Sequence, residues 1–434
     1  MKKRLTILSS VWFLFPTILF LTVWVGVSHS QGILREGITI NSDFGVGARS
    51  MGMGGAHVAA ASDVSAMYWN PAGLVFVRRI ELSATLTREE YEIKTSFFNT
   101  ASDRTKKKTR LNSLGLAYPI PTLRGSLVFG MAINRVHSFD RIYAREGYND
   151  ILAYNDQNEV VSGDSYEKET QISAGGLYNW SFCGAMDISE QLSLGIALHI
   201  WSGDYEGVFE LVDTDTEDVW TFHENTLTQE DDFDLDGYSV GFGGVYRANR
   251  QLTFGFSLNS KVNLEFDGEQ REEKIYVDDD ELMSEKVSYY GFEDAEIPWM
   301  FNLGSAYTHK MFKLAADVTY MDWSETENVF DIDNLENKHL YDEVLKLRIG
   351  GEFLLPNSPI RLRAGVCSDP LPYQGTKIDR DRVYFTGGIG VLLDRVFTID
   401  LAYVSGSWER VNTEYEYQEE TKSNRVFVTS SYHF

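Results

Sequence analysis

Regular alternation between apolar and small or polar residues dominates this sequence from residue 79 to its carboxyl end. Leu194 and Ile196, for example, share one face of their segment, and Ala197 and His199 share the other. Because successive side chains of a β-strand point to opposite faces, this period of two predicts strands. The pattern predicts fourteen strands, near 79–98, 109–118, 125–138, 170–186, 192–205, 237–246, 251–262, 297–308, 311–323, 344–354, 360–367, 382–393, 396–406 and 424–434.

The connections between these segments alternate between short and long. The short ones are predicted tight turns at 119–124, 187–191, 247–250, 309–310, 355–359 and 394–395. The others are long and polar, and they include 139–169, 207–236, 263–296 and 324–343. Outer-membrane barrels sort their turns and loops in this way, and a closed sheet leaves no unpaired edge in the lipid. We therefore predict an all-β fold, a 14-stranded antiparallel transmembrane β-barrel over residues 79–434, in the outer membrane of a Gram-negative-type cell.

The amino terminus has the order of a secretory signal peptide. Three basic residues at 2–4 precede an uncharged apolar stretch at 5–27, and the small residues Ser28 and Ser30 follow. This order predicts a signal peptide over residues 1–30 that is removed on export. The apolar stretch is longer than usual, so an uncleaved anchor is the alternative.

Composition and motifs exclude several classes of protein. The formal net charge of −25 argues against a nucleic-acid partner, which would require a basic surface. After residue 30 no run of 18 apolar residues occurs, so a helical transporter is excluded. The sequence also lacks a nucleophile elbow, a phosphate-binding loop and a His-Glu-x-x-His zinc motif. We therefore expect no enzyme activity, no cofactor and no metal site.

Residues 31–78 do not alternate, and they are rich in glycine and methionine. A compact segment ahead of a barrel with a lumen is expected to fold inside it. This segment contains the runs GARSMGMGGA at 47–56 and YWNPAGL at 68–74. Both resemble the amino-terminal hatch of the FadL/TodX family of outer-membrane transporters for hydrophobic compounds. Two later stretches, 298–324 and 361–388, agree with the same family in order and position.

The resemblance implies passive transport of long-chain fatty acids or similar hydrophobic small molecules. The ligand would pass from external loops to a lumenal pocket and leave through a lateral opening gated by the hatch. The family's hatch element maps onto Asn70, Pro71, Ala72 and Gly73, and the opening is attributed to a kink in the third strand, where Gly130 is the candidate.

The resemblance also implies contact with outer-membrane lipid and lipopolysaccharide. The barrel-insertion machinery, which reads a terminal aromatic residue such as Phe434, is a further implied partner. The hatch motif is shared with PorV-like barrels. An adaptor or anchor in protein secretion is therefore the alternative function.

Alternation also predicts which charges face the lumen. In the strand at 344–354 the apolar residues point to lipid, so Lys346 and Arg348 point inward, and Arg361 and Arg363 do so in the next strand. These four cations are candidates for binding the head group of a ligand. The alternative is a polar lumen wall in which Arg361 or Arg363 pairs with Glu352.

The long connections at 207–236 and 263–296 are strongly acidic. We expect a solvated acidic surface, with divalent-cation binding as the alternative. Aromatic residues within these connections are candidates for a ligand-landing groove, namely Trp220, Phe222, Tyr289, Tyr290 and Phe292.

Overall fold

The computed structural model describes residues 45–98, 100–149, 152–154, 160–162, 165–216, 222–278, 282–326, 341–372, 382–412 and 417–434. The predicted signal peptide at 1–30 lies outside these residues, as does the first part of the predicted hatch. None of the helices in the described part of the chain combines the length and apolar character that a membrane crossing needs.

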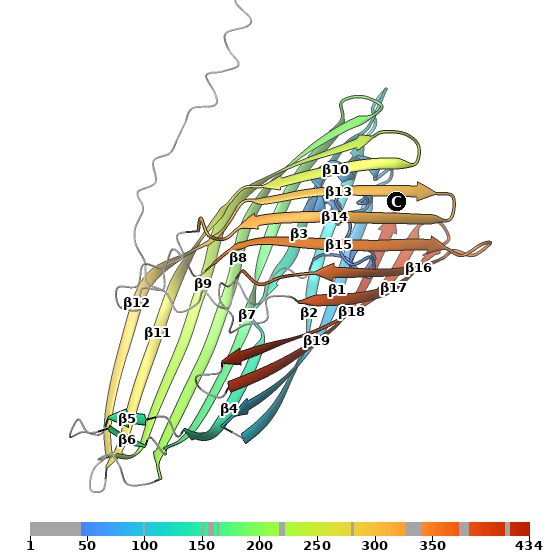
Figure 1. The fold of residues 1–434 in the computed structure, drawn as a ribbon. Coiled ribbons are helices and arrows are strands. Elements are labelled where there is room, and N and C mark those ends of the chain that lie inside the picture. Colours follow the sequence, from blue (N-terminus) through green and yellow to red (C-terminus); the bar gives the residue numbers. More distant parts are fainter. Residues whose placement is uncertain are drawn as a thin grey trace, which may run out of the picture.

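One antiparallel sheet closes into a barrel (Figure 1). The first strand, β1 (Glu81–Phe97), pairs along one edge with β2 (Thr100–Ile120) and along the other with the last strand, β19 (Tyr417–His433). The remaining segments of this sheet are β3 (Leu127–Ser138), β4 (Arg141–Asn149), β7 (Ser165–Asp187), β8 (Leu192–Asp215), β9 (Phe222–Arg247), β10 (Leu252–Asn259), β11 (Val262–Asp278), β12 (Leu282–Ile297), β13 (Met300–His309), β14 (Phe312–Asp322), β15 (Glu343–Leu354), β16 (Ile360–Ser368), β17 (Val383–Leu393) and β18 (Phe397–Asn412). A separate small hairpin consists of β5 (Leu152–Tyr154) and β6 (Val160–Ser162).

Three strands of the barrel are interrupted. Both β3 and β4 pair with β7, and both β10 and β11 pair with β9. The partners of β10 and β11 on the other side are β13 and β12. The 17 segments of the sheet therefore correspond to fourteen strands, and the predicted fourteen-stranded barrel is confirmed.

The two faces of the wall follow the predicted alternation. On β15, Leu345, Leu347 and Ile349 are 47–59% exposed, as expected for side chains that face lipid. The intervening Lys346 and Arg348 are only 5% and 8% exposed and face inward. A charge on the lipid face costs about 2–4 kcal/mol for Lys or Arg at mid-bilayer, so this sorting fixes the register of the wall.

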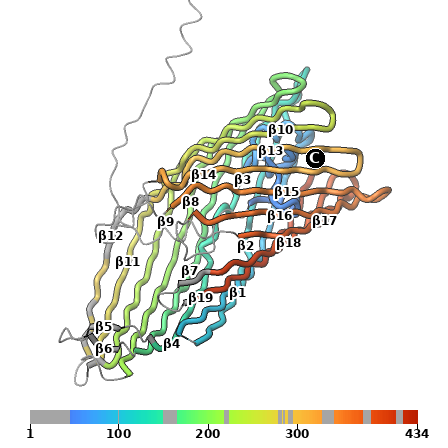
Figure 2. Tube along the Cα trace, in the orientation of Figure 1, coloured from blue at the N-terminus to red at the C-terminus, as the bar shows by residue number. Residues whose placement is uncertain are grey.

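The acidic connections predicted as loops are largely strand. Residues 207–236 belong mostly to β8 and β9, and residues 263–296 belong mostly to β11 and β12, which pair along their length. The prediction of loops was wrong because these strands continue past the apolar band, where the outward residues are carboxylates and not lipid-facing apolar groups. Figure 2 shows this wall of β7, β8, β9, β11 and β12 extending beyond the shorter strands β14–β17.

The amino-terminal residues 45–77, which we call the inner segment, lie within the barrel. They form two short helices, α2 (Ala48–Gly52) and α3 (Ala66–Trp69), and a 3-10 helix, η1 (Pro71–Phe76). Their backbone is hydrogen-bonded to side chains around the wall. The contacts are Gly47 N to Asn112 Oδ1, Ala48 N to Thr429 Oγ1, Gly54 N to Thr386 Oγ1, Val58 N to Asp317 Oδ2 and Trp69 O to Ser257 Oγ. These bonds reach strands on several sides of the lumen.

Candidate functional site

Asn70 ties the inner segment together and holds it to the wall. Its side chain is fully buried, and its Nδ2 donates to the carbonyl oxygens of Val58 and Gly244 at 2.8 and 3.1 Å. Its Oδ1 accepts from Ala72 N at 3.1 Å and so caps the first turn of η1. Pro71, Ala72 and Gly73 are also buried. The predicted hatch element therefore has a structural role, because Asn70 connects two parts of the inner segment and the wall. Its role in gating stays a prediction.

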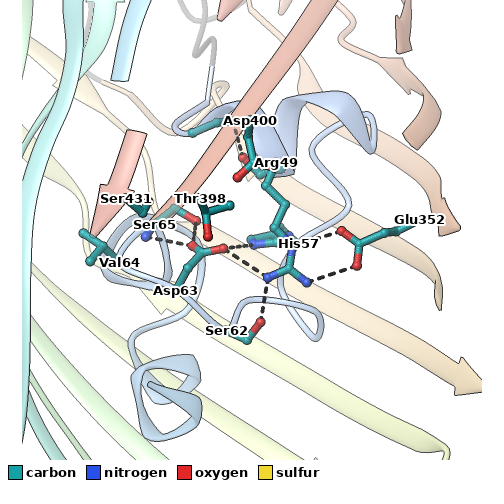
Figure 3. Close-up of polar contacts among 12 residues, drawn as sticks. Arg49, His57, Ser62, Asp63, Val64, Ser65, Glu352, Thr398, Asp400 and Ser431 are labelled. Carbon is teal, nitrogen blue, oxygen red and sulfur yellow. Dashed lines mark hydrogen bonds and ion pairs between the residues drawn. The ribbon is translucent and has the colours of Figure 1, made fainter. Parts of the chain in front are cut away.

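An ionic network connects the inner segment to the barrel wall, and Figure 3 shows Arg49 between Asp63 and Glu352. Arg49 of the inner segment contacts Asp63 and Glu352, both at 3.3 Å. Glu352 also pairs with Arg363 at 2.8 Å, and Arg363 pairs with Asp400 at 2.6 Å. The network therefore joins the inner segment to β15, β16 and β18 through paired charges inside the barrel.

His57 and Asp63 belong to the same network, with Nε2 and Oδ2 3.8 Å apart. Burial lowers the pKa of His57 below its usual value, although the neighbouring Asp63 acts in the opposite direction. Burial by itself raises the pKa of Asp63, but His57 and Arg49 outweigh it and bring this pKa well below its usual value. Asp63 is therefore a carboxylate that helps to hold Arg49 in place.

The third strand is bent inward, and this bend opens a seam in the wall. Pairing of β2 with β3 covers only Ser113–Ile120 of β2, and the register of β3 with β7 shifts between Arg135 and His137. Past the bend, β4 lies on the lumenal side of β1, because the inward-facing Thr95 donates its Oγ1 hydrogen to the carbonyl of Ala144 at 2.6 Å. Within the described residues, β2 from Thr100 to Asn112 thus pairs along one edge only. We call this interruption between β2 and β4 the seam.

Gly130, the residue predicted for the kink, is not at the seam. It pairs in regular register with Ala117 on β2 and Cys183 on β7. The bend lies farther along, where every residue from Asn134 to Asp140 is buried. Loss of alternation in this run is the sequence signal that identifies the bend, and glycine content is not.

Charged side chains, some buried and some half-buried, bridge the seam. Asp140 of the bend accepts hydrogen bonds from Arg110 of β2 and from Arg135 of β3, each at 3.0 Å. Lys106 Nζ donates to the carbonyl oxygens of Arg141 and Ser173. Side-chain contacts therefore take the place of backbone hydrogen bonds across this part of the wall.

A comparison with known families identifies the fold family. The model of the family described as outer membrane protein transport protein (OMPP1/FadL/TodX) matches residues 34–432. The chain belongs to this family. The family consists of outer-membrane barrels, so the predicted location in the outer membrane of a Gram-negative-type cell is confirmed. No curated protein matches the chain.

Solved structures show the same fold at low sequence identity. The Pseudomonas putida toluene transporter TodX is 16% identical, with a TM-score of 0.64 over 90% of this chain and 99% of TodX. A Pseudomonas aeruginosa FadL homologue is 14% identical, with a TM-score of 0.63 over 91% and 100% of the two chains. The Ralstonia pickettii toluene transporter TbuX is 16% identical, with a TM-score of 0.58 over 90% and 98%.

The predicted head-group cations of this FadL/TodX family member are mostly occupied by partners. Lys346 pairs with Asp369 at 2.8 Å, and Arg348 donates to Thr319 Oγ1 at 2.6 Å. Arg363 pairs with Glu352 as the alternative interpretation predicted, and Arg361 is half-buried. Arg348 also lines a small cavity, where its guanidinium carbon lies 5.6 Å from the centre of the Trp69 ring.

That cavity is a small pocket between the inner segment and the wall. Its lining combines aromatic rings with two arginines, and includes Tyr68, Trp69, Arg348, Tyr384 and Arg425. Arg425 stacks on Tyr384 with 5.3 Å between the guanidinium carbon and the ring centre. The cavity is only about 30 Å³, which leaves room for a few water molecules at most. A larger ligand fits here only if the inner segment moves.

An apolar cluster lies above the inner segment, and the sequence did not predict it. Its members come from the bend and from the inner faces of β7, β8, β9, β11 and β12, and they are Val136, Phe139, Leu177, Tyr205, Phe233, Leu235, Val262, Leu264, Phe266 and Ala295. Tyr68 of the inner segment packs against this cluster and also lines the small pocket. Alternation of Phe233 and Leu235 with aspartates was the available signal.

The aromatic residues predicted for a landing groove are not on loops where they are described. Phe222 begins β9, and Tyr289, Tyr290 and Phe292 lie on β12 opposite β11. The structure describes the backbone at these four positions, and Trp220 lies outside the described residues. Their assignment to a ligand groove stays a prediction. Among the described residues, no group of three or more His, Cys, Asp or Glu is placed to hold a metal ion.

Proposed function

We propose that this protein is a passive outer-membrane channel for long-chain fatty acids or similar hydrophobic small molecules. The observation that carries the proposal is the contrast within the lumen, where an apolar cluster lies beside the seam and an ionic network lies below the inner segment. Burial of alkyl surface at about 25 cal/mol per Å² would draw a hydrophobic ligand into the apolar part. The process requires no catalytic step.

In this proposal the ligand leaves sideways through the seam. Passage along the barrel axis would bring the ligand against Arg49, Glu352, Arg363 and Asp400, whose paired charges it cannot solvate. The seam offers another route because the contacts that bridge it among the described residues come from side chains. The inner segment acts as the gate, since the small pocket beside Trp69 must widen before a ligand can enter.

The similar proteins support a hydrophobic cargo without fixing its identity. Two of them are toluene transporters and one is a FadL homologue. The alternative, an adaptor for exported proteins, would be favoured by a polar lumen. The apolar cluster supports transport.

The test measures uptake of labelled palmitate and labelled toluene by cells that make the full chain. The variant Asn70→Ala removes both bonds of Asn70 Nδ2 and should reduce uptake severalfold at equal surface abundance. The matched control is Asn302→Ala, which removes a buried asparagine bonded to Ser257 and Thr319 of the wall. Mass spectrometry of ligands that copurify with the wild type gives an independent measurement. Absence of a hydrophobic ligand together with uptake no higher than in cells lacking the protein would refute transport.

A further inference from the structure

A concentrated basic run lies on the part of β2 that borders the seam. Five of the seven residues at 104–110 are Lys or Arg, in a chain whose formal charge is −25. This part of β2 has a backbone partner on one edge only, within the described residues. The other edge faces the bent third strand.

Four of these cations lie on the lumenal face. Residues paired directly across an antiparallel ladder share a face. Arg104, Lys106, Lys108 and Arg110 pair with Ile93, Tyr91, Glu89 and Thr87 of β1, which are all 2–6% exposed and point inward. Lys107 pairs with Glu90 on the opposite face and forms an ion pair with it at 2.8 Å. At about 3.3 Å per residue, successive members of the row are roughly 6.6 Å apart.

The row is only partly engaged by internal partners. Arg110 contacts Asp140, and Lys106 contacts two backbone carbonyls. Lys108 and Arg104 are exposed, and Lys108 forms no ion pair with any described residue. Glu89, which lies opposite Lys108 on β1, and Asp140, which contacts Arg110, both also pair with Arg135. Among the described residues, Arg104 and Lys108 therefore carry positive charge that no ion pair neutralises.

The basic row adjoins the apolar cluster. Asp140 accepts a hydrogen bond from Arg110 and follows Phe139 directly in the chain. Phe139 belongs to the cluster, where its ring centre lies 5.5 Å from that of Tyr205. An amphiphile could therefore place its alkyl tail among Phe139 and its neighbours while its head group reaches β2. A neutral hydrocarbon would leave the cations without a ligand.

We propose that Arg104, Lys106, Lys108 and Arg110 form a binding site for the anionic head group of the cargo at the seam. The inference rests on the proposed transport function and specifies its substrate class, an amphiphile with a carboxylate or similar anionic group. A carboxylate that binds Lys108 and Arg110 replaces the contact of Arg110 with Asp140 by an equivalent charge-assisted bond. Binding of the head group and release of one contact across the seam are thereby coupled.

The test compares palmitate with 1-hexadecanol, which has the same alkyl chain and an uncharged head. Binding is measured on the purified full chain in a nonionic detergent at low salt. Lys108→Gln should weaken palmitate binding by about three- to tenfold and leave 1-hexadecanol within about twofold. Lys108→Arg should retain palmitate binding, and Lys107→Gln, which removes the same charge from the opposite face, should leave both probes unchanged.

Several outcomes would overturn the assignment. Equal effects of Lys107→Gln and Lys108→Gln, or an equal loss of both probes, would refute a head-group site on the lumenal face. If the wild type binds both probes and no lysine variant discriminates between them, the head-group site fails while the transport function stands. If the wild type binds neither probe and gives no uptake, the proposed function itself fails.

A lipid head group could supply the same anionic chemistry, so a second measurement separates the two sources. Lipopolysaccharide that copurifies with the wild type is compared with that of the double variant Arg104→Gln/Lys108→Gln. Unchanged lipopolysaccharide with weakened palmitate binding supports the cargo site. Loss of lipopolysaccharide with unchanged palmitate affinity would assign the row to membrane lipid and overturn the proposal.

Discussion

The wall from β14 to β18 and the wall around β2 to β4 both contain buried charges, but the charges have different structural roles. On β16, regular alternation points Arg363 inward, where it meets Glu352 on the neighbouring β15 and Asp400 on β18. On β3, alternation stops at Asn134, and Arg135 meets Asp140 across a bend in its own strand. In the regular wall, charges hold the inner segment through Arg49. At the seam, they replace the backbone ladder.

This difference shows how one barrel combines a continuously paired wall with a less stable interruption, the seam. A backbone ladder is continuous and cooperative, whereas a few charged side chains can exchange partners one at a time. Both arrangements are buried, so burial alone does not distinguish them. The distinction lies in whether the strands beneath the charges are paired.

The largest expected effect is in the regular wall. Arg363→Met removes a guanidinium that is 1% exposed and leaves Glu352 and Asp400 without it. We expect a loss of about 3–5 kcal/mol in the free energy of unfolding, measured by guanidinium titration of the folded barrel. The half-buried Arg361 provides the control, and Arg361→Met should cost less than about 1 kcal/mol. Equal losses for the two variants would contradict the role of the paired charges.

A smaller and more local effect is expected at the seam. Asp140→Asn removes the carboxylate shared by Arg110 and Arg135, at a cost of about 2–3 kcal/mol. Hydrogen exchange followed by mass spectrometry should show faster exchange in β3 and β4 and unchanged exchange in β14–β18. A uniform increase over the whole barrel would show that the seam is not an independent region of low stability.

The contact between the inner segment and β8, on another part of the wall, can be tested through a glycine. A Cβ at Gly195 would lie 2.5 Å from Ala72 N and 2.6 Å from the carbonyl carbon of Pro71. The backbone must shift to relieve this clash, so Gly195→Ala should cost about 1–3 kcal/mol of unfolding free energy. Wild-type stability in this variant would show that the inner segment moves freely away from the wall.

The smallest effect is expected at Gly130. A Cβ here would lie 2.7 Å from Met67 Sδ, which is part of a flexible side chain that can move aside. Gly130→Ala should therefore cost less than about 1 kcal/mol, and palmitate uptake should stay at the wild-type level. A selective loss of uptake would restore Gly130 as a residue of the opening and would place that opening away from Arg135.

Much of the wall was predictable because its rule is local. The two-residue alternation predicted Lys346, Arg348 and Arg363 inside the barrel and Leu345 and Leu347 outside it, as the structure has them. The pairing of Arg363 with Glu352 followed as one of two alternatives. The acidic strands β8, β9, β11 and β12 were missed, because outside the membrane band their outward residues are polar and the apolar residues are confined to the lumenal face.

The sequence by itself determined that this chain forms a closed fourteen-stranded barrel with an inner segment, because the same two-residue alternation recurs from strand to strand, apart from the bend in the third. Only the tertiary structure decided where the wall is interrupted and which cations are occupied. The bend at Arg135 depends on partners such as Glu89 and Arg110 on other strands. Contacts between residues that are far apart in the chain leave no periodic signal, and they become visible only when the strands are in register.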